Sequence, residues 1–259
     1  MSRCGSVGWT VSSLSTTLPR FHSSRNPDDP GWDAALADVR SAESSLSGRL
    51  RVNVPVVFGR RFVVPVVAEL LTRHPRLAVD LVFDDRYVNP VDQGFDVVVR
   101  IGVPVDSSLT SHSLGQSTRT LAAAPSYIAA HGKPKAPRDL ARHQCLVHTE
   151  LGASAVWSFK KSGKSHRASV RGRISADNSE ATLALARAGH GICLLASWLL
   201  QDDVRDGTLV PLLSGYAPPL APIRALTPPG RQIPPRVRTF IQALREVTAA
   251  DRQQKTALM

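Results

Sequence analysis

The sequence predicts an α/β protein built on a parallel sheet, and two observations support that prediction. Segments in which apolar and polar residues alternate, as they do along strands, are interleaved with segments in which apolar residues recur every three or four positions, as on one helix face. The composition, 42% apolar and 20% charged, is ordinary for a globular protein. Strands that alternate with helices favour parallel pairing, because a helical crossover returns the chain to run in the same direction.

The first half of the chain is predicted to alternate three strands with two helices. Leu50, Val52 and Val54 alternate with polar residues, which indicates a strand. The helix that follows is expected to begin near Arg61 or Phe62, because Pro65 is tolerated in the first turn of a helix but not in its interior. The expected elements are a strand at 48–56, a helix that ends before 75, a strand at 77–83, a short helix at 89–94 and a strand at 95–102.

The second half continues the alternation and adds a hairpin. Ser162 and Gly163 stand between two strand-like segments, which is the pattern of a two-residue hairpin turn. Asp177 or Asn178 is expected to cap a helix that Gly189 ends. The expected elements are a strand leading into a helix at 120–132, a short strand at 143–148, a hairpin at 157–175, a helix at 176–191, a strand at 192–196, a helix at 197–207, strands at 209–213 and 223–227, and a helix at 234–248.

The two ends of the chain differ from its middle. Residues 1–31 are rich in Ser, Thr and Pro and show little periodicity, so we expect them to be disordered. Residues 32–47 carry a narrow apolar stripe with charged residues elsewhere, which favours a linker helix. Residues 251–259 are expected to form a tail.

Charge and cysteine content limit the partners and the compartment. The net charge is +11, and residues 49–259 hold 28 of the 32 basic residues. Such a balance favours anionic partners, although a solvated basic surface explains it equally well. Cys4, Cys145 and Cys193 are odd in number and follow no secretion signal, which indicates reduced thiols and a cytoplasmic protein. The sequence has no apolar run of the roughly 18 residues that a membrane span needs, so we expect no membrane partner.

Several motifs in order give the chain a family resemblance. GRLRVNVPVVFGRRFVVPVVAELLTRHPRLAVDLVFDD, QGFDVVVRIG, LAAAPSYIAAHGKPKAPRDLARHQCL and ADNSEATLALARAGHGICLLASWLL resemble the effector-binding, or substrate-binding, domain of LysR-type transcription regulators. The resemblance covers about residues 32–250. It implies two Rossmann-like subdomains joined by two crossover strands, as in type II periplasmic binding proteins. Its domain occupies 49–250, with subdomain I at 49–121 and 223–250 and subdomain II at 122–222.

The same resemblance implies a DNA-binding helix-turn-helix ahead of the linker helix. Residues 1–31 show no helix-turn-helix periodicity, and their basic residues are Arg3, Arg20 and Arg25. Phosphate contacts that hold DNA need more positive charge than that. We therefore expect this chain to carry the sensor part of a regulator, and to reach promoter DNA only through a helix-turn-helix that it lacks.

The resemblance also implies that a small-molecule effector binds in the cleft between the subdomains. Helix N-termini near Arg61, Ser126 and Asn178 are expected to point free backbone N–H groups at an anion there. Where family members often carry Ser or Thr, this chain has Val56, Val57 and Phe58, which favours an anionic ligand with an apolar or aromatic body. The candidate effector-binding residues are Val57, Phe58, Arg61, Arg100, Ile101, Ser126, Asn178, Ser179 and Thr227.

Structural roles remain open for some of these candidates. Helix capping alone explains Asn178 and Ser179, and for Arg100 a structural role, pairing with an acid such as Asp96 or Asp84, is favoured over ligand binding. In the resembling family two copies pair antiparallel, and apolar residues on the first helix, such as Leu70, favour such a homodimer.

Other functions have weaker support in the sequence. A solute-binding protein for transport, or a stand-alone ligand-binding protein, shares the predicted fold, but transport requires an export signal. The sequence has no GxSxG, HExxH, GxGxxG or P-loop motif, so we expect neither an enzyme nor a cofactor. His143, Cys145 and His148 form a weak candidate for a metal site. The basic run between Lys160 and Arg173 is explained as the charged edge of a hairpin.

Overall fold

The computed structural model describes residues 46–86, 90–102, 108–148, 155–230 and 232–256, with side chains described up to residue 250. All of these residues belong to one unit, Ser45–Met259. The expected disordered segment at 1–31, nearly all of the expected linker helix at 32–47 and the question of a helix-turn-helix therefore lie outside the described residues. None of the described helices is both long and apolar enough to span a bilayer.

A five-stranded mixed sheet forms one half of the described structure, in the strand order β2-β1-β3-β12-β4. β1 pairs in parallel with β2 and β3, as the sequence predicted, whereas β12 runs antiparallel to β3 and β4. β4 was not predicted, because its segment TSHSLGQS is polar and carries little strand signal. The strands are β1 (Gly48–Val54), β2 (Leu77–Phe83), β3 (Val97–Ile101), β4 (Thr110–Ser117) and β12 (Ala221–Thr227).

The helix after β1 begins earlier than the sequence predicted. It runs through α2 (Val56–Phe58), the π-helical turn η1 (Gly59–Val63) and α3 (Val64–Arg73), so the expected start near Arg61 is wrong. The Val64 N–H donates to the Gly59 carbonyl, five residues back. This wider turn accommodates Pro65, which has no N–H and would clash with a carbonyl of a regular helix.

Gly59 allows this helix to approach the sheet closely. A Cβ atom built at Gly59 would lie 2.4 Å from the Val54 Cγ2 and 2.7 Å from the Phe83 ring. Val54 and Phe83 are the last residues of β1 and β2, so any larger side chain would push the helix away from both strands.

A smaller antiparallel sheet, in the order β10-β5-β11, forms the other half. The hairpin of β7 and β8 turns through Ser162 and Gly163, whose φ angles of 48° and 77° fit the two-residue turn predicted there. This half contains β5 (Arg119–Ala123), α5 (Pro125–His131), η2 (Pro137–Arg142), β6 (Val147–His148), β7 (Val156–Lys161), β8 (Lys164–Ser169), β9 (Ser175–Ala176), α6 (Ser179–Arg187), β10 (Cys193–Ala196), α7 (Ser197–Arg205) and β11 (Val210–Leu212).

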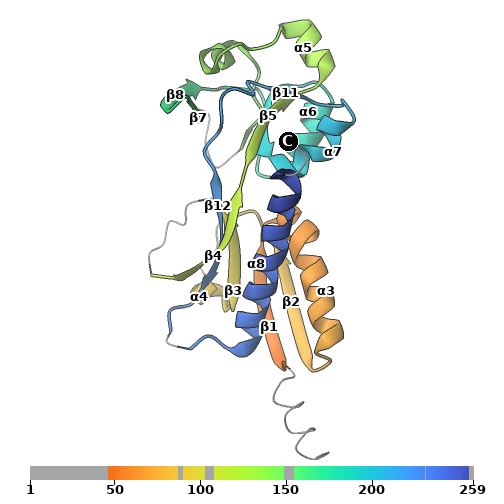
Figure 1. Cartoon of the computed structure of the whole chain (residues 1–259), viewed down its shortest axis with the longest axis vertical. Coiled ribbons are helices and arrows are strands. Elements are labelled where there is room, and N and C mark those ends of the chain that lie inside the picture. Colours follow the sequence, from red (N-terminus) through yellow and green to blue (C-terminus); the bar gives the residue numbers. More distant parts are fainter. Residues whose placement is uncertain (1–45, 87–89, 103–107, 149–154, 231, 257–259) are drawn as a thin grey trace, which may run out of the picture. The chain divides into compact units, whose positions relative to one another are not determined.

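Two helices cover the five-stranded sheet. α3 and α8 (Pro235–Thr256) lie side by side along it (Figure 1). α8 continues past residue 248, where the sequence predicted its end. Buried side chains of both helices, including Val66, Leu70, Phe240 and Leu244, form one core with the sheet.

The chain passes between the two sheets twice. Thr118 alone separates β4, in the larger sheet, from β5, in the smaller one, and the chain returns after β11 into β12 (Figure 1). This is the predicted fold class, two α/β halves joined by two crossover strands. A ligand site bounded by both sheets follows naturally from that connection.

Candidate ligand cavity between the two sheets

A cavity of about 490 Å³ lies between the halves and is lined by both. Its volume is within the range of roughly 300–1,000 Å³ that small-molecule sites occupy. The lining is mainly apolar, with a small set of polar groups that could orient a ligand. The apolar lining includes Val57, Phe58, Ile101, Leu146, Trp157, Leu194, Leu195, Trp198, Leu199 and Leu220, and the polar lining comprises Asp85, Arg100, Ser117, Arg119, Ser179 and Thr182.

The structure brings five of the nine candidate residues to this cavity. Val57 and Phe58 come from α2, Arg100 and Ile101 from the end of β3, and Ser179 from the start of α6. The other four, Arg61, Ser126, Asn178 and Thr227, are not among its lining residues.

Thr227 lies away from the cavity because of the direction of β12. That strand is antiparallel to β3, so its first residues, Ala221 and Pro222, meet the cavity end of β3. Thr227 ends the strand far along the ladder, where its hydroxyl hydrogen-bonds the His112 Nε2 at 3.2 Å. Sequence alone had not indicated an antiparallel fourth strand.

Arg61 and Ser126 are held elsewhere. Arg61 lies inside the π-helical turn, with its guanidinium 5.5 Å from the Phe62 ring centroid and 5.8 Å from that of Trp198. Ser126 is the second residue of α5, and its hydroxyl lies against the turn after α6, where a Cβ on Gly189 would come within 2.8 Å of it. Of the three helix N-termini that were predicted to converge, those of α2 and α6 meet at the cavity, whereas no residue of α5 is among its lining.

Asn178 is the cap of α6, as one of the sequence interpretations held. Its Oδ1 accepts hydrogen bonds from the backbone N–H groups of Glu180 and Ala181 at 2.9 and 3.0 Å. Its Nδ2 donates to the Asp85 Oδ2 at 3.1 Å, and the Asp85 Oδ1 accepts from the Val56 N–H at 2.9 Å. Asn178 therefore connects α6 to the beginning of α2 through one carboxylate.

A second contact joins the same two elements. The guanidinium of Arg60, in the π-helical turn, donates to the Glu180 carboxylate at 2.8 Å. Both side chains are substantially exposed, so the pair contributes at most about 1 kcal/mol. Glu180 is two residues from Asn178, so the ion pair and the Asn178 bridge together hold α6 against the beginning of the first helix.

Arg100 is buried at the end of β3 and is held by polar groups of its own half. It donates to the Val99 carbonyl at 2.6 Å, to the Asn53 Oδ1 at 2.7 Å and to the Arg86 carbonyl at 2.6 Å. The acid Asp84, which the sequence proposed as a partner, pairs with Arg86, and that contact lowers the pKa of Asp84.

Arg119 and Asp85 line the cavity but were not predicted from the sequence. Arg119 begins β5 at the junction of the two sheets, and burial lowers the pKa of its guanidinium. Its Nη2 donates to the Pro219 carbonyl at 3.4 Å, and its buried Nε has no hydrogen-bond partner among the described residues. A basic residue two positions before the apolar run LAAA was the available signal.

The cysteines and histidines of the second half have structural surroundings. Burial raises the pKa of Cys145 and of Cys193 to about 12, which keeps both thiols protonated and unreactive. His143 contacts the Tyr127 hydroxyl at 3.2 Å through its Nδ1. Among the residues that the structure describes, no group of three or more His, Cys, Asp or Glu side chains is placed to hold a metal ion.

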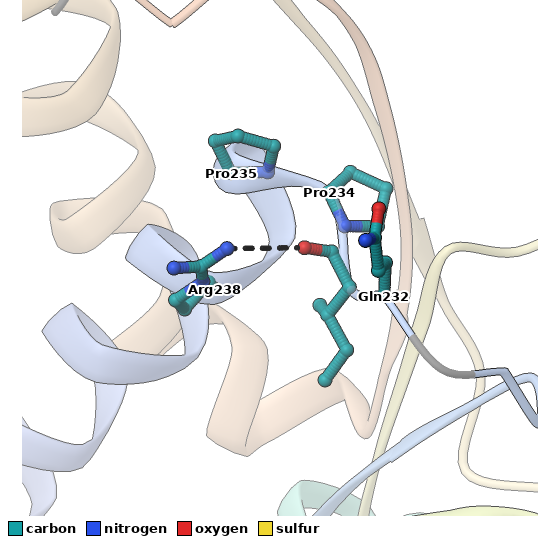
Figure 2. A pocket seen from close by; sticks show the side chains of 5 residues that line it. Gln232, Pro234, Pro235 and Arg238 are labelled. Carbon is teal, nitrogen blue, oxygen red and sulfur yellow. Dashed lines mark hydrogen bonds between the residues drawn. The ribbon is translucent and has the colours of Figure 1, made fainter.

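A second cavity, of about 670 Å³, lies at the beginning of α8. Gln232, Ile233, Pro234, Pro235 and Arg238 line it, and Arg238 donates to the Ile233 carbonyl at 3.5 Å (Figure 2). Its described lining comes from one short segment and includes none of the candidate residues. The cavity between the sheets is the better candidate, because two halves of the chain build it.

Comparison with known proteins agrees with this architecture. The family model described as LysR substrate binding domain matches residues 43–249. The regulator PtxR of Pseudomonas aeruginosa is 36% identical over 214 residues, which cover 83% of this chain and 69% of PtxR. The regulator CrgA of Neisseria meningitidis is 28% identical over 215 residues, which cover 82% of this chain and 71% of CrgA.

Solved structures show the same relationship. A structure of CrgA from Neisseria meningitidis superposes with a TM-score of 0.70 at 27% identity, covering 84% of this chain and 74% of that one. Full-length AphB of Vibrio cholerae, named as a virulence activator, gives a TM-score of 0.66 at 25% identity, covering 83% and 73%. The chain belongs to the LysR substrate-binding-domain family, the effector-binding part of LysR-type transcription regulators.

Proposed function

We propose that this chain senses a small molecule in the cavity between its two sheets and so controls transcription as part of a LysR-type regulator. The observation that supports the proposal most directly is that both halves line the cavity. A ligand that contacts both halves favours the arrangement in which they are close, and its differential affinity supplies the free energy for the change. The division into subdomain I at 49–121 and 223–250 and subdomain II at 122–222 is part of this proposal.

The lining favours a small anion with an apolar body. Arg100 and Arg119 supply positive charge, while Phe58, Trp157 and Trp198 offer an aromatic wall. The chemistry is binding and not catalysis, and no cofactor is proposed. Transport by a solute-binding protein is not favoured, since the relatives are named as transcription regulators.

We further propose that the protein is a cytoplasmic homodimer that pairs through α3. The residues that the sequence suggested, such as Leu70, are instead buried in the core of their own chain. Val64 and Leu71 are the large hydrophobic residues of α3 that are exposed, at 42% and 41%, and β2 beside the helix is an edge strand. An exposed apolar helix face next to an open edge suits a two-fold interface.

A ligand screen with a cavity-blocking variant tests the sensing proposal. Ser179→Phe places a ring in the cavity while leaving the Asn178 cap of α6 in place. A ligand at a hundredfold excess over its Kd is expected to stabilise the wild type by about 2.7 kcal/mol in a thermal-shift assay, and the variant much less. Equal stabilisation of both proteins would place the ligand elsewhere and refute the proposal.

DNA binding by this chain is expected to be weak. Its positive charge alone gives salt-sensitive association without sequence preference. A mobility-shift assay with unlabelled competitor DNA at physiological salt measures this. Tight binding to one promoter that resists the competitor would contradict the expectation.

A further inference from the structure

We propose that Arg119 binds the carboxylate of the ligand and that Asp85 accepts a hydrogen bond from a hydroxyl or ammonium group elsewhere on it. This inference rests on the proposed sensing function and names its ligand class, a monocarboxylate with an apolar body and one hydrogen-bond donor. Both side chains line the same cavity: Asp85 follows β2 of the larger sheet, and Arg119 begins β5 of the smaller sheet.

The helix N-termini at the cavity are already occupied by side chains of the protein. The Asp85 carboxylate accepts from the Val56 N–H at the start of α2, and so holds the position that an anionic ligand would take there. At the start of α6 the Asn178 amide accepts from the Glu180 and Ala181 N–H groups. A ligand carboxylate is therefore more readily bound by a cationic side chain than by backbone groups.

Of the two arginines in the lining, Arg119 has more donors to offer. Three oxygens within 2.7 Å already accept from the Arg100 guanidinium. Arg119 makes one long hydrogen bond, at 3.4 Å, to a carbonyl. None of the ion pairs among the described residues includes Arg119. A desolvated guanidinium gains most from an anion, which can accept two parallel hydrogen bonds from it.

Trp198 supplies a second, independent observation. Its side chain lines the cavity and is 6% exposed, yet its buried indole Nε1 has no acceptor among the described residues. Like the Arg119 Nε, it is a buried donor of this lining without an acceptor among the described residues. Buried donors are nearly always satisfied in native proteins, so a ligand that brings an acceptor into the cavity would gain hydrogen bonds from both groups. Its ring, packed edge-on against Phe58 at 6.3 Å, suits a flat apolar body.

Asp85 determines what the rest of the ligand can be. Each of its oxygens accepts one hydrogen bond from the protein, and each retains capacity for another. A second anionic group placed near this carboxylate would be repelled, whereas a hydroxyl or an ammonium would be bound. The cavity therefore selects against dicarboxylates and in favour of hydroxylated or aminated monocarboxylates.

The test uses matched probes on the full chain. Benzoate, 3-hydroxybenzoate, 3-hydroxybenzamide and isophthalate, together with a parallel aliphatic set, differ in one group at a time. Affinities are measured by calorimetry for the wild type, Arg119→Gln, Arg119→Lys and Asp85→Ala. Arg224→Gln is the matched control, because the Arg224 Nε is likewise buried without a partner among the described residues, but Arg224 is not part of the cavity lining.

We expect the hydroxylated monocarboxylate to bind most tightly and the amide to bind poorly. Arg119→Gln should weaken carboxylate binding by about tenfold or more, Arg119→Lys by less, and Arg224→Gln hardly at all. Asp85→Ala should remove the advantage of the hydroxyl group and improve binding of isophthalate. Folding of each variant is checked by circular dichroism, and Arg119→Lys keeps the test decisive if Arg119→Gln does not fold.

The expected outcomes distinguish a failure of the proposed ligand contacts from a failure of the proposed sensing function. If Ser179→Phe abolishes binding while Arg119→Gln and Arg119→Lys bind like the wild type, Arg119 is not the anchor and the sensing function stands. If the amide or a dicarboxylate binds as well as the hydroxylated monocarboxylate, the ligand class is wrong. If no probe binds the wild type, the ligand class is likewise wrong. If a probe binds and its affinity is unchanged in Ser179→Phe, both proposals are overturned.

Discussion

Asn178 performs two tasks that substitutions can separate. Its Oδ1 caps α6 through two backbone N–H groups, and its Nδ2 donates to the Asp85 carboxylate in the other half. Asn178→Ala removes both, whereas Asn178→Ser keeps a good capping oxygen but is too short to reach Asp85.

The magnitudes follow from these contacts. Loss of the cap costs about 1 kcal/mol of unfolding free energy. Loss of the hydrogen bond to a charged, partly buried carboxylate costs about another 1 kcal/mol, at the low end of its range because solvent reaches the pair. We expect Asn178→Ala to be destabilised by about 2 kcal/mol and Asn178→Ser by about half of that.

Urea unfolding followed by circular dichroism measures both values, provided that the slope with denaturant is the same for all three proteins. Equal destabilisation by Ala and Ser would show that the bridge to Asp85 contributes nothing. Stability of Asn178→Ala within experimental error of the wild type would refute the capping assignment as well.

Three further predictions concern packing, a buried charge and assembly. Gly59→Ala should lose about 1–3 kcal/mol of unfolding free energy because its methyl group overlaps a valine and a phenylalanine, whereas Gly230→Ala, with no neighbour within 4 Å, should be neutral; comparable losses for both would refute the close-packing argument. Arg187→Ala should cost about 2 kcal/mol, because it leaves the Asp203 carboxylate, 5% exposed, without its partner; the cost is below that of a fully buried pair because Arg187 is 49% exposed, and an unchanged urea midpoint would contradict this. Leu71→Asp should convert a dimer to a monomer in light scattering, and a monomeric wild type at tens of micromolar would count against the dimer.

The local parts of the fold were predictable from sequence. Alternation located β1 and β2, the two-residue turn located the β7–β8 hairpin, and a short polar side chain located the cap of α6. These signals lie within a few residues of each other, so no tertiary information is needed to interpret them. The predicted start of the first helix was wrong, because the π-helical turn that accommodates Pro65 has no recognisable sequence signature.

The candidate site was only partly predictable, because it depends on strand direction and on burial. Thr227 was placed at the cavity on the assumption that β12 ends there, and antiparallel pairing puts the beginning of that strand there instead. The importance of Arg119 depends on which groups surround it after folding, since the residue type alone says nothing of its missing partners. Asp85 was not predicted as a cavity residue, because a carboxylate is not expected next to a site for an anionic ligand.

The two connections between the sheets lead into neighbouring strands of the larger sheet, β4 and β12. β4 and β12 are hydrogen-bonded to each other along their length, from Ala221 opposite Ser117 to Thr227 opposite Thr110, with a shift of register between Ile223 and Arg224. This pairing lies within the larger sheet, and the parts of the chain that pass to the smaller one are Thr118 and the segment between β11 and β12. Both links leave the larger sheet at one place, where Ser117 is paired with Ala221. We expect a ligand that contacts both halves to change the angle between them at these links, without altering the strand pairing inside the larger sheet.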